Sequence, residues 1–254
     1  MFKERFKKQK VVLGTWLQIP SPSICEIVSK QGLDWIAVDM EHTEIGFETL
    51  ADMFRGLKGT KTAPFVRVRT NDALEIRRSL DIGAAGVIVP LIDTAEEAKN
   101  AVSYSKYPPN GKRGHAFCRA NGWGEDFHDY AANANEKISV FVMIESRMAV
   151  ENIDDILVTD GLDGIFIGPY DMSASYGVPG DISNKLVVDS CNKVLESCKR
   201  HNKIPGIHIV KPDSNIIKEH VKKGFRFIAV GIDTLFLING IKNAVSAVKQ
   251  VAND

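Results

Sequence analysis

Eight short apolar runs alternate with amphipathic stretches along the whole chain, and this alternation limits the possible folds more than any other feature. An apolar run bounded by polar segments is typical of a strand that is buried on both faces of a parallel sheet. The predicted strands occupy residues 11–18, 35–40, 63–68, 86–92, 139–145, 164–169, 204–209 and 225–232. A helix is predicted after each strand, at residues 22–31, 47–58, 72–82, 94–105, 147–158, 184–202, 214–223 and 234–251. Because eight βα units fill 254 residues, we predict an α/β fold, a (β/α)8 TIM barrel, rather than an open doubly wound sheet.

No shift in composition and no flexible linker divides the chain, so residues 1–254 are predicted to form a single barrel domain. One connection interrupts the regular alternation. It comprises residues 107–127, and a further short helix is predicted after it, at about 128–136. A connection of this length in a compact barrel is typical of a functional loop or an interface. The last helix is long and apolar, so it either closes the barrel or packs on a neighbouring subunit.

The charge balance excludes some classes of partner. The chain has 32 basic and 32 acidic residues, and this net charge of zero gives no general attraction to nucleic acid or to an anionic membrane. Residues 1–10 are rich in Lys and Arg and are interpreted as a solvated helix or arm, since the apolar stretch after them is too short to span a bilayer. The four cysteines lack metal-binding spacing, which indicates a reduced, cytoplasmic protein.

Two acidic residues follow neighbouring apolar runs: Glu145 ends SVFVMIE, and Asp171 comes directly after GIFIGPY. The carboxyl ends of parallel strands meet at one end of a barrel, so both side chains are expected in one pocket. Since a carboxylate in such a place needs a cation, a donor or water, we predict that Glu145 and Asp171 bind a divalent metal. Oxygen ligands favour Mg²⁺ or Mn²⁺, and they do not exclude Co²⁺ or Zn²⁺. The alternative is a structural pair of acids bound to arginines.

Other polar residues at strand ends suit a small 2-oxo acid. Arg67 has the fork geometry for a carboxylate or keto oxygen, and His42 can move a proton near neutral pH while Asp39 orients it. The backbone amides from Gly168 to Asp171 are placed to bind a carboxylate where the next helix begins. His208 lies at the end of the seventh strand, either as a substrate contact or as a pocket wall. The other readings are a helix cap for His42 and an internal ion pair for Arg67.

Several motifs resemble one family in order along nearly the whole chain. They are GTWLQ (14–18), GLDWIAVDMEH (32–42), FVRV (65–68), LDIGAAGVIVP (80–90), YPPNGKRG (107–114), IES (144–146), GLDGIFIGPYDMSASYG (161–177), PGI (205–207) and FIAVGID (227–233). The chain resembles the class II pyruvate aldolases of the HpcH/HpaI family. Members of that family cleave a 4-hydroxy-2-oxo acid between C3 and C4, which gives pyruvate and an aldehyde.

The resemblance implies a role for each matching residue. It implies that Glu145 and Asp171 bind the metal and that Arg67 polarises the keto group. It also implies that His42, oriented by Asp39, transfers the proton of the hydroxyl that becomes the aldehyde. It also implies substrate contacts from Gly168, Pro169, Tyr170, Asp171 and His208, and it brings Asp81 to a neighbouring subunit's site. Finally, it implies a homohexamer with its active sites near subunit interfaces and with the C-terminal helix exchanged between subunits.

The chain departs from the family pattern mainly around the aldehyde end of the expected pocket. Met143, Tyr170 and His208 replace residue types that are common in relatives, and HAFCRANGWG follows the YPPNGKRG motif. Two other functions remain open, a lyase acting on a citramalyl- or malyl-CoA thioester and a catalytically silent barrel that binds metabolites. A Schiff-base mechanism is disfavoured because no predicted strand has an interior lysine, and Lys211 lies beyond the seventh strand.

Overall fold

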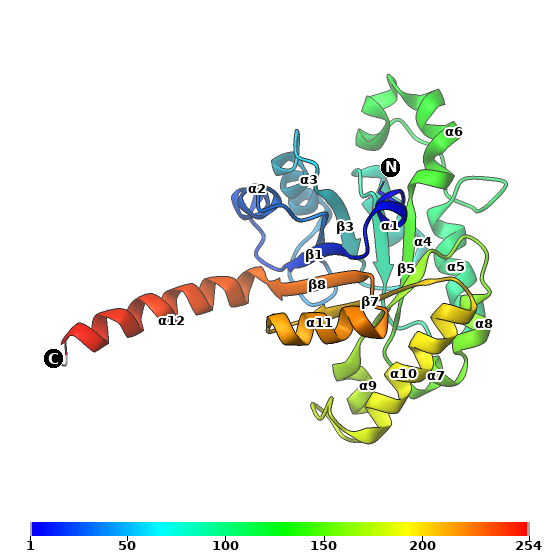
Figure 1. The fold of residues 1–254 in the computed structure, drawn as a ribbon. Helices are drawn as coiled ribbons and strands as arrows, with labels where there is room; N and C mark the ends of the chain where they lie inside the picture. The colour runs from blue at the N-terminus through cyan, green and yellow to red at the C-terminus, as the bar shows by residue number, and fades with distance from the viewer. Residues whose placement is uncertain (1, 253–254) are drawn as a thin grey trace.

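The computed structural model describes residues 2–252 and has eight parallel strands that form a closed barrel in sequence order (Figure 1). The strands are β1 (Val12–Leu17), β2 (Trp35–Asp39), β3 (Ala63–Arg67), β4 (Gly86–Val89), β5 (Ser139–Ile144), β6 (Gly164–Ile167), β7 (Ile204–Ile209) and β8 (Phe227–Ile232). The last strand pairs with the first, which closes the sheet. The predicted (β/α)8 fold is therefore confirmed.

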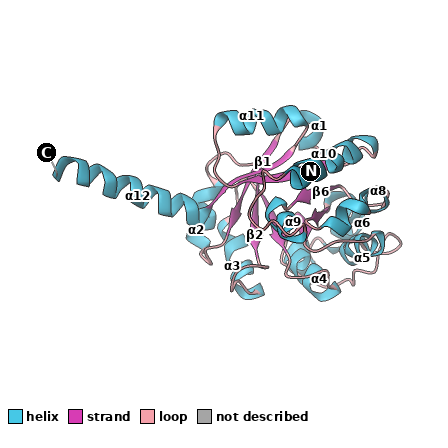
Figure 2. Cartoon of the chain, turned by 90° about the horizontal axis from the view of Figure 1, so that it is seen from below, coloured by secondary structure: helices cyan, strands magenta, loops and turns pink. Residues whose placement is uncertain are grey.

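Helices surround the barrel, as the view from below also shows (Figure 2). They are α1 (Arg5–Lys8), α2 (Pro22–Ser29), α3 (Phe47–Gly56), α4 (Ala73–Asp81), α5 (Ala95–Ser105), η1 (Arg119–Gly124), α6 (Phe127–Lys137), α7 (Arg147–Glu151), α8 (Ile153–Leu157), α9 (Pro169–Ser175), α10 (Lys185–Arg200), α11 (Ser214–Lys223) and α12 (Asp233–Ala252). The helix predicted over 147–158 is divided at Asn152. A short helix, α9, begins directly after β6 and precedes the helix predicted from residue 184.

Aromatic side chains fill the inside of the barrel. Trp35 stacks on Phe227 with ring centroids 4.0 Å apart, and Phe141 stacks on the other side at 4.3 Å. Such pairs add about 0.5–1.5 kcal/mol each beyond the area they bury. Gly14 makes room for this cluster, because a Cβ there would lie 2.1 Å from the Trp35 ring. The inside of the barrel is thus packed at this level by aromatic rings.

The N-terminal segment closes one end of the barrel. The predicted solvated helix is present as α1, with Lys7 and Lys8 exposed, but the segment is not a free arm. Phe2 and Phe6 are buried, and Phe2 contacts Phe65 edge-on with centroids 4.8 Å apart. The basic residues between them hold the segment in place through ion pairs, Lys3 with Asp163 at 2.7 Å and Arg5 with Asp34. Two phenylalanines four positions apart lie on one face of a helical turn, and the surrounding charges hide this pattern in the sequence.

The connection after α5 forms a separate feature on the outside of the barrel. It leads into η1, where Gly122 and Trp123 both have positive φ values, of 62° and 59°. Phe117 and Trp123 are 72% and 69% exposed, and Phe117 packs edge-on against Phe127 at the start of α6. An exposed aromatic surface of this kind is compatible with either predicted role, a functional loop or an interface, and the choice between them stays open.

The C-terminal helix α12 leaves the barrel and runs out into solvent in both views (Figures 1 and 2). It therefore does not cover its own barrel. Several of its apolar side chains are exposed: Phe236, Leu237, Ile238, Ile241, Val245 and Val248. No helix within residues 2–252 combines the length and apolarity needed to cross a membrane.

Candidate active site

A cavity of about 380 Å³ opens at the carboxyl ends of the strands, at the end of the barrel where α9 lies. We call it the mouth. Its lining includes Trp16, Gln18, Arg67, Met143, Phe166, Gly168, Pro169, Tyr170, Asp171, His208, Val210 and Thr234. Most of the residues predicted for substrate binding thus lie around one cavity.

A larger cavity of about 1050 Å³ lies at the opposite end, near Lys3, Lys106 and Asp163. Three of its four lysines already have partners: Lys106 donates to the carbonyls of Asn135 and Ile138, Lys203 donates to those of Thr159 and Leu162, and Lys3 pairs with Asp163. None of the predicted site residues lines it.

Arg67 is fixed by two carboxylates at the edge of the mouth. Its Nε donates to Asp39 Oδ1 at 3.0 Å and its Nη2 to Asp39 Oδ2 at 2.6 Å, which is a bidentate fork. Asp39 and Arg67 are register partners on β2 and β3, so the sheet itself brings them together. Although burial opposes the charge on Asp39, hydrogen bonds and attraction from Arg67 hold the pKa of that carboxyl below its usual value. The guanidinium also lies 4.7 Å from the centre of the Trp16 ring.

Glu41 is a second acidic neighbour of Arg67. Arg67 Nη1 lies 3.2 Å from Glu41 Oε2, but the alignment is not that of a hydrogen bond, so this buried oxygen has no hydrogen-bond partner. Burial raises the pKa of Glu41 to about 7; Arg67 opposes this rise, while Asp39 and Asp171 add to it. A buried carboxylate without a full set of partners indicates a place where a cation or a bound water would be stabilised.

Glu145 lies where the prediction put it, directly after β5. It is 5% exposed, and its Oε1 accepts a hydrogen bond of 2.7 Å from the backbone N–H of Leu91. A Cβ on Gly168 would come within 2.9 Å of Glu145 Oε2, so the absence of a side chain there gives the carboxylate its space. Burial is the main reason that the pKa of Glu145 is raised to about 7; the charges of Glu41 and Asp171 add to this rise, and the Leu91 hydrogen bond and Arg67 oppose it. The carboxylates of this region therefore repel one another.

These residues fit a divalent cation. Glu145 and Asp171 interact electrostatically across the mouth, and a cation would relieve their repulsion. Within residues 2–252, no three His, Cys, Asp or Glu side chains form a metal-binding group. An ion would thus take two protein carboxylates and fill its other positions with water or substrate oxygens, which is usual for Mg²⁺.

The expected pairing of the Asp39 carboxylate with the His42 ring is not formed, and this part of the prediction was wrong. Asp39 Oδ1 accepts from the backbone N–H of His42 at 3.3 Å, and both of its oxygens are engaged by Arg67. The His42 ring is 59% exposed at the rim, and its Nε2 lies 3.6 Å from Glu41 Oε2. Asp39 thus orients Arg67, and the acid beside His42 is Glu41.

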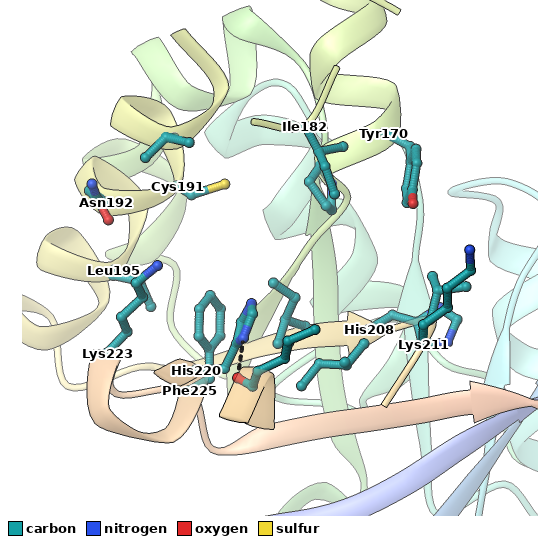
Figure 3. Close-up of a pocket in the computed structure, with 16 residues that line it drawn as sticks. Tyr170, Ile182, Cys191, Asn192, Leu195, His208, Lys211, His220, Lys223 and Phe225 are labelled. Carbon is teal, nitrogen blue, oxygen red and sulfur yellow. Dashed lines mark hydrogen bonds between the residues drawn. The ribbon is translucent and has the colours of Figure 1, made fainter. Parts of the chain in front are cut away.

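His208 and Tyr170 lie on the side of the mouth formed by β7 and α9. His208 Nε2 is 2.7 Å from the carbonyl oxygen of Gly231, and burial lowers the pKa of the ring to about 4. Tyr170 is 50% exposed. Behind them is an apolar side chamber of about 340 Å³, bounded by α10 and α11 and lined in part by Cys191, Leu195 and Phe225 (Figure 3).

Asp81 does not lie at the mouth of its own chain. It ends α4, and its carboxylate accepts a 2.7 Å hydrogen bond from Nη2 of the buried Arg113. Gly168 and Pro169, by contrast, line the mouth and begin α9. A contact of Asp81 with a neighbouring subunit remains a prediction.

Three residues of the site were missed. Trp16 has a buried indole N–H without a partner beside Arg67, Glu41 has its free oxygen there, and Gln18 donates to Asp39 at 3.1 Å. All three belong to segments, GTWLQ and DMEH, that the sequence analysis selected. Alternation along β1 was the available signal, since Trp16 and Gln18 are two positions apart.

Comparison with known proteins decides the family. The model of the HpcH/HpaI aldolase/citrate lyase family matches residues 12–240. The chain belongs to this family. The 5-keto-4-deoxy-D-glucarate aldolase of Salmonella paratyphi C (strain RKS4594) is 38% identical over 233 residues, which cover 91% of this chain and 90% of that protein.

Solved structures of similar proteins agree with this assignment. A HpcH/HpaI aldolase/citrate lyase family protein from Burkholderia cenocepacia J2315 has a TM-score of 0.92 at 30% identity, and the match covers 97% of this chain and 98% of that one. The citrate synthase SbnG has a TM-score of 0.89 at 29% identity, with 99% and 98% covered. The predicted family is confirmed, and with it the class of a metal-dependent class II aldolase, a carbon–carbon lyase.

Proposed function

We propose that this protein cleaves a 4-hydroxy-2-oxo acid reversibly between C3 and C4, which gives pyruvate and an aldehyde, with Mg²⁺ or Mn²⁺ as its metal. The observation that supports this most strongly is the set of charges at the carboxyl ends of the strands: Asp171 and Arg67 line the mouth, and the buried Glu145 is close enough to both for their charges to act on its carboxylate. The relatives named 5-keto-4-deoxy-D-glucarate aldolases favour a sugar-acid-like substrate of this type.

Glu145 and Asp171 would hold the metal. Glu145 is locked by the Leu91 N–H through one oxygen, which leaves the other free. A bound metal would supply Lewis-acid polarisation of the 2-oxo group and would stabilise negative charge on its oxygen. Co²⁺ and Zn²⁺ also suit oxygen ligands and are tested with the other two ions.

Arg67 positions the pyruvyl half of the substrate. Because Asp39 fixes the guanidinium as a bidentate partner, its remaining N–H groups are held in one direction before substrate binds. They would donate to the keto or carboxylate oxygen of the substrate. Gly168 and Pro169 bring the backbone of α9 close to the same half, since neither places a bulky polar group there.

Proton transfer is assigned to His42. Its ring takes the proton of the C4 hydroxyl, the electrons of the C3–C4 bond move to the pyruvyl half as an enolate, and C4 leaves as the aldehyde. The proton taken by His42 is then returned to C3 of the enolate through water, which gives pyruvate and restores the neutral ring. The position of His42 at the rim beside Glu41 suits this step, because the aldehyde has to leave toward solvent.

Assembly is the second part of the proposal. We infer that α12 packs on another copy of the chain, because its exposed apolar side chains have no partner within residues 2–250. The family resemblance implies that the assembly is a homohexamer in which Asp81 lies near the mouth of a neighbouring subunit. A cytoplasmic location is proposed on the four free cysteines, three of which are buried.

The test is removal and return of the metal. Purified protein is stripped with a chelator and dialysed, and cleavage or condensation with pyruvate is followed by product NMR. Activity should be lost and should return with Mg²⁺ or Mn²⁺. Full activity after rigorous metal removal would refute the proposal, and turnover of CoA thioesters alone would point to the thioester lyase.

A further inference from the structure

We propose that His208 selects an aldehyde that bears a hydroxyl group, by accepting a hydrogen bond from that hydroxyl at Nδ1. This inference rests on the proposed aldolase function and names the class of aldehyde it uses. It also assigns a role to a residue at which the chain departs from the family pattern.

The tautomer of His208 is set by the backbone of the neighbouring strand. The carbonyl oxygen of Gly231 on β8 is 2.7 Å from His208 Nε2, and a carbonyl can only accept, so Nε2 carries the proton. In a neutral ring the other nitrogen, Nδ1, is then a hydrogen-bond acceptor. No described residue donates a hydrogen bond to Nδ1.

The surroundings keep the ring neutral. Burial is the main cause that lowers the pKa of His208 to about 4, and the positive charge of Arg67 lowers it further, while Gly231 and Asp39 oppose the change. The other facing ring is Trp16, which carries no charge and lies 6.0 Å away between centroids. At neutral pH the ring therefore stays uncharged, and Nδ1 can accept a hydrogen bond.

His208 is placed for contact with the substrate rather than for catalysis. It lines the mouth together with Arg67 and Asp171, and it also borders the side chamber, where Figure 3 shows it across from Tyr170. The polar side chains that share the mouth directly after β1 and on α12 are already engaged, since Gln18 donates to Asp39 and the Thr234 hydroxyl lies 3.5 Å from Gln18 Oε1. The unused acceptor, His208 Nδ1, would form a hydrogen bond with a hydroxyl group of the aldehyde, whereas a methyl group in the same place could form none.

The experiment compares two aldehydes that differ by one hydroxyl, glycolaldehyde and acetaldehyde, in condensation with pyruvate and Mn²⁺. The readout is the ratio of their kcat/KM values, each referred to the free, unhydrated aldehyde. A second pair, 3-hydroxypropanal and propanal, repeats the comparison with the hydroxyl one carbon further away. Wild-type protein should prefer the hydroxylated member of at least one pair.

Two variants separate the nitrogens of the ring. In His208→Gln the amide nitrogen takes the place of Nε2 and can still donate to Gly231, but no acceptor remains at the Nδ1 position. In His208→Asn the amide lies at the Nδ1 position, and the bond to Gly231 is lost. His208→Leu removes both groups. The control is His220→Gln, because His220 lines only the side chamber and its Nδ1 contacts Ile216 O of its own helix at 2.8 Å.

We expect the preference ratio to fall about tenfold in His208→Gln and His208→Leu, to stay largely intact in His208→Asn, and to be unchanged in His220→Gln. A ratio unchanged in both His208→Gln and His208→Leu overturns the inference, as does an equal loss with both members of a pair. Circular dichroism confirms that each variant is folded.

Failure of the underlying function is detected separately. Wild-type protein with Mn²⁺ should exchange the methyl protons of pyruvate in D₂O, which needs the pyruvate end of the site and no aldehyde. Absence of this exchange contradicts the aldolase proposal itself, and His208 then has no such role. Exchange without any effect of His208 on the ratio overturns only the inference.

Discussion

At the scale of single residues, Arg67 is distinguished by its fork onto Asp39. A lysine has one charged nitrogen and cannot make both hydrogen bonds. Arg67→Lys should therefore lower kcat/KM for the oxo acid on the order of 100-fold, with part of the loss in KM. Steady-state kinetics checks this. Arg69→Lys is the control, since Arg69 pairs with Glu75 outside the mouth, and an equal loss in both variants would contradict the assignment.

Glu145 makes one backbone hydrogen bond and is proposed to bind metal with its other oxygen. In Glu145→Gln the side-chain carbonyl can still accept from Leu91, so the fold should persist while the charge is lost. We expect Mn²⁺ affinity to fall by at least about tenfold, measured by calorimetry. Glu151→Gln, which removes an exposed charge paired with Arg147, is the matched control. Unchanged affinity in Glu145→Gln would exclude this residue as a ligand.

The pH dependence of stability reports on His208. Its folded-state pKa of about 4 lies below the ordinary value of 6.5, so the unfolded chain binds more protons between these two pH values. Its contribution is present above pH 6.5 and is lost as the pH falls toward 4. Denaturant unfolding of metal-free protein across this range should show a shallower slope in His208→Gln than in wild type. Parallel slopes would mean that the ring titrates normally.

Residue-level prediction put Arg67 and Asp171 at the mouth and Glu145 directly after β5, where the structure has them; their roles stay predictions. It failed for Asp39, which was assigned to His42 because the two are close in sequence. The actual partner is 28 residues away and is brought alongside by the register of β2 and β3. Which residues of two strands lie side by side depends on the tertiary structure, so the local sequence around Asp39 does not predict its partner.

At the scale of elements, α5 begins with a complete capping box. The Thr94 hydroxyl accepts from the Glu97 N–H, and the Glu97 carboxylate accepts from the Thr94 N–H. Thr94→Ala should lower the free energy of unfolding by about 1 kcal/mol, as measured by urea denaturation. Thr70→Ala, on the exposed loop after β3, should change it by less than about 0.5 kcal/mol. Similar losses in the two variants would argue against the cap.

The elements that were placed well have repeating patterns of apolar residues, and those that were missed do not. The strands and the helices of the outer layer follow from periodicity within a few residues. The helix α9 is only seven residues long and follows β6 without a loop, so no period is visible. In η1 the turn depends on Gly122 and on a non-glycine residue, Trp123, with positive φ, which local preferences do not indicate.

At the scale of the whole molecule, α12 extends away from the barrel with exposed apolar side chains. Ile241 is 55% exposed, and burying it against another chain would be favourable. Ile241→Asp should shift the protein toward smaller species, detected by light scattering after size exclusion. Asn243→Asp, which adds the same charge on the same helix, is the control. A wild-type mass of 28.0 kDa would contradict assembly altogether.

The closure of the barrel by β1 and β8 has a consequence for biosynthesis. The first strand ends at Leu17 and its partner begins at Phe227, so about 200 residues must emerge from the ribosome before the ring can be sealed. Phe2 and Phe6 have rings about 6 Å from that of Phe227, so they too cannot form their final contacts until residue 227 has been synthesised. A nascent chain stalled before residue 227 therefore exposes the edge of β1 and the side chains of Phe2 and Phe6. Exposed strand edges and apolar side chains of this kind are what chaperones bind.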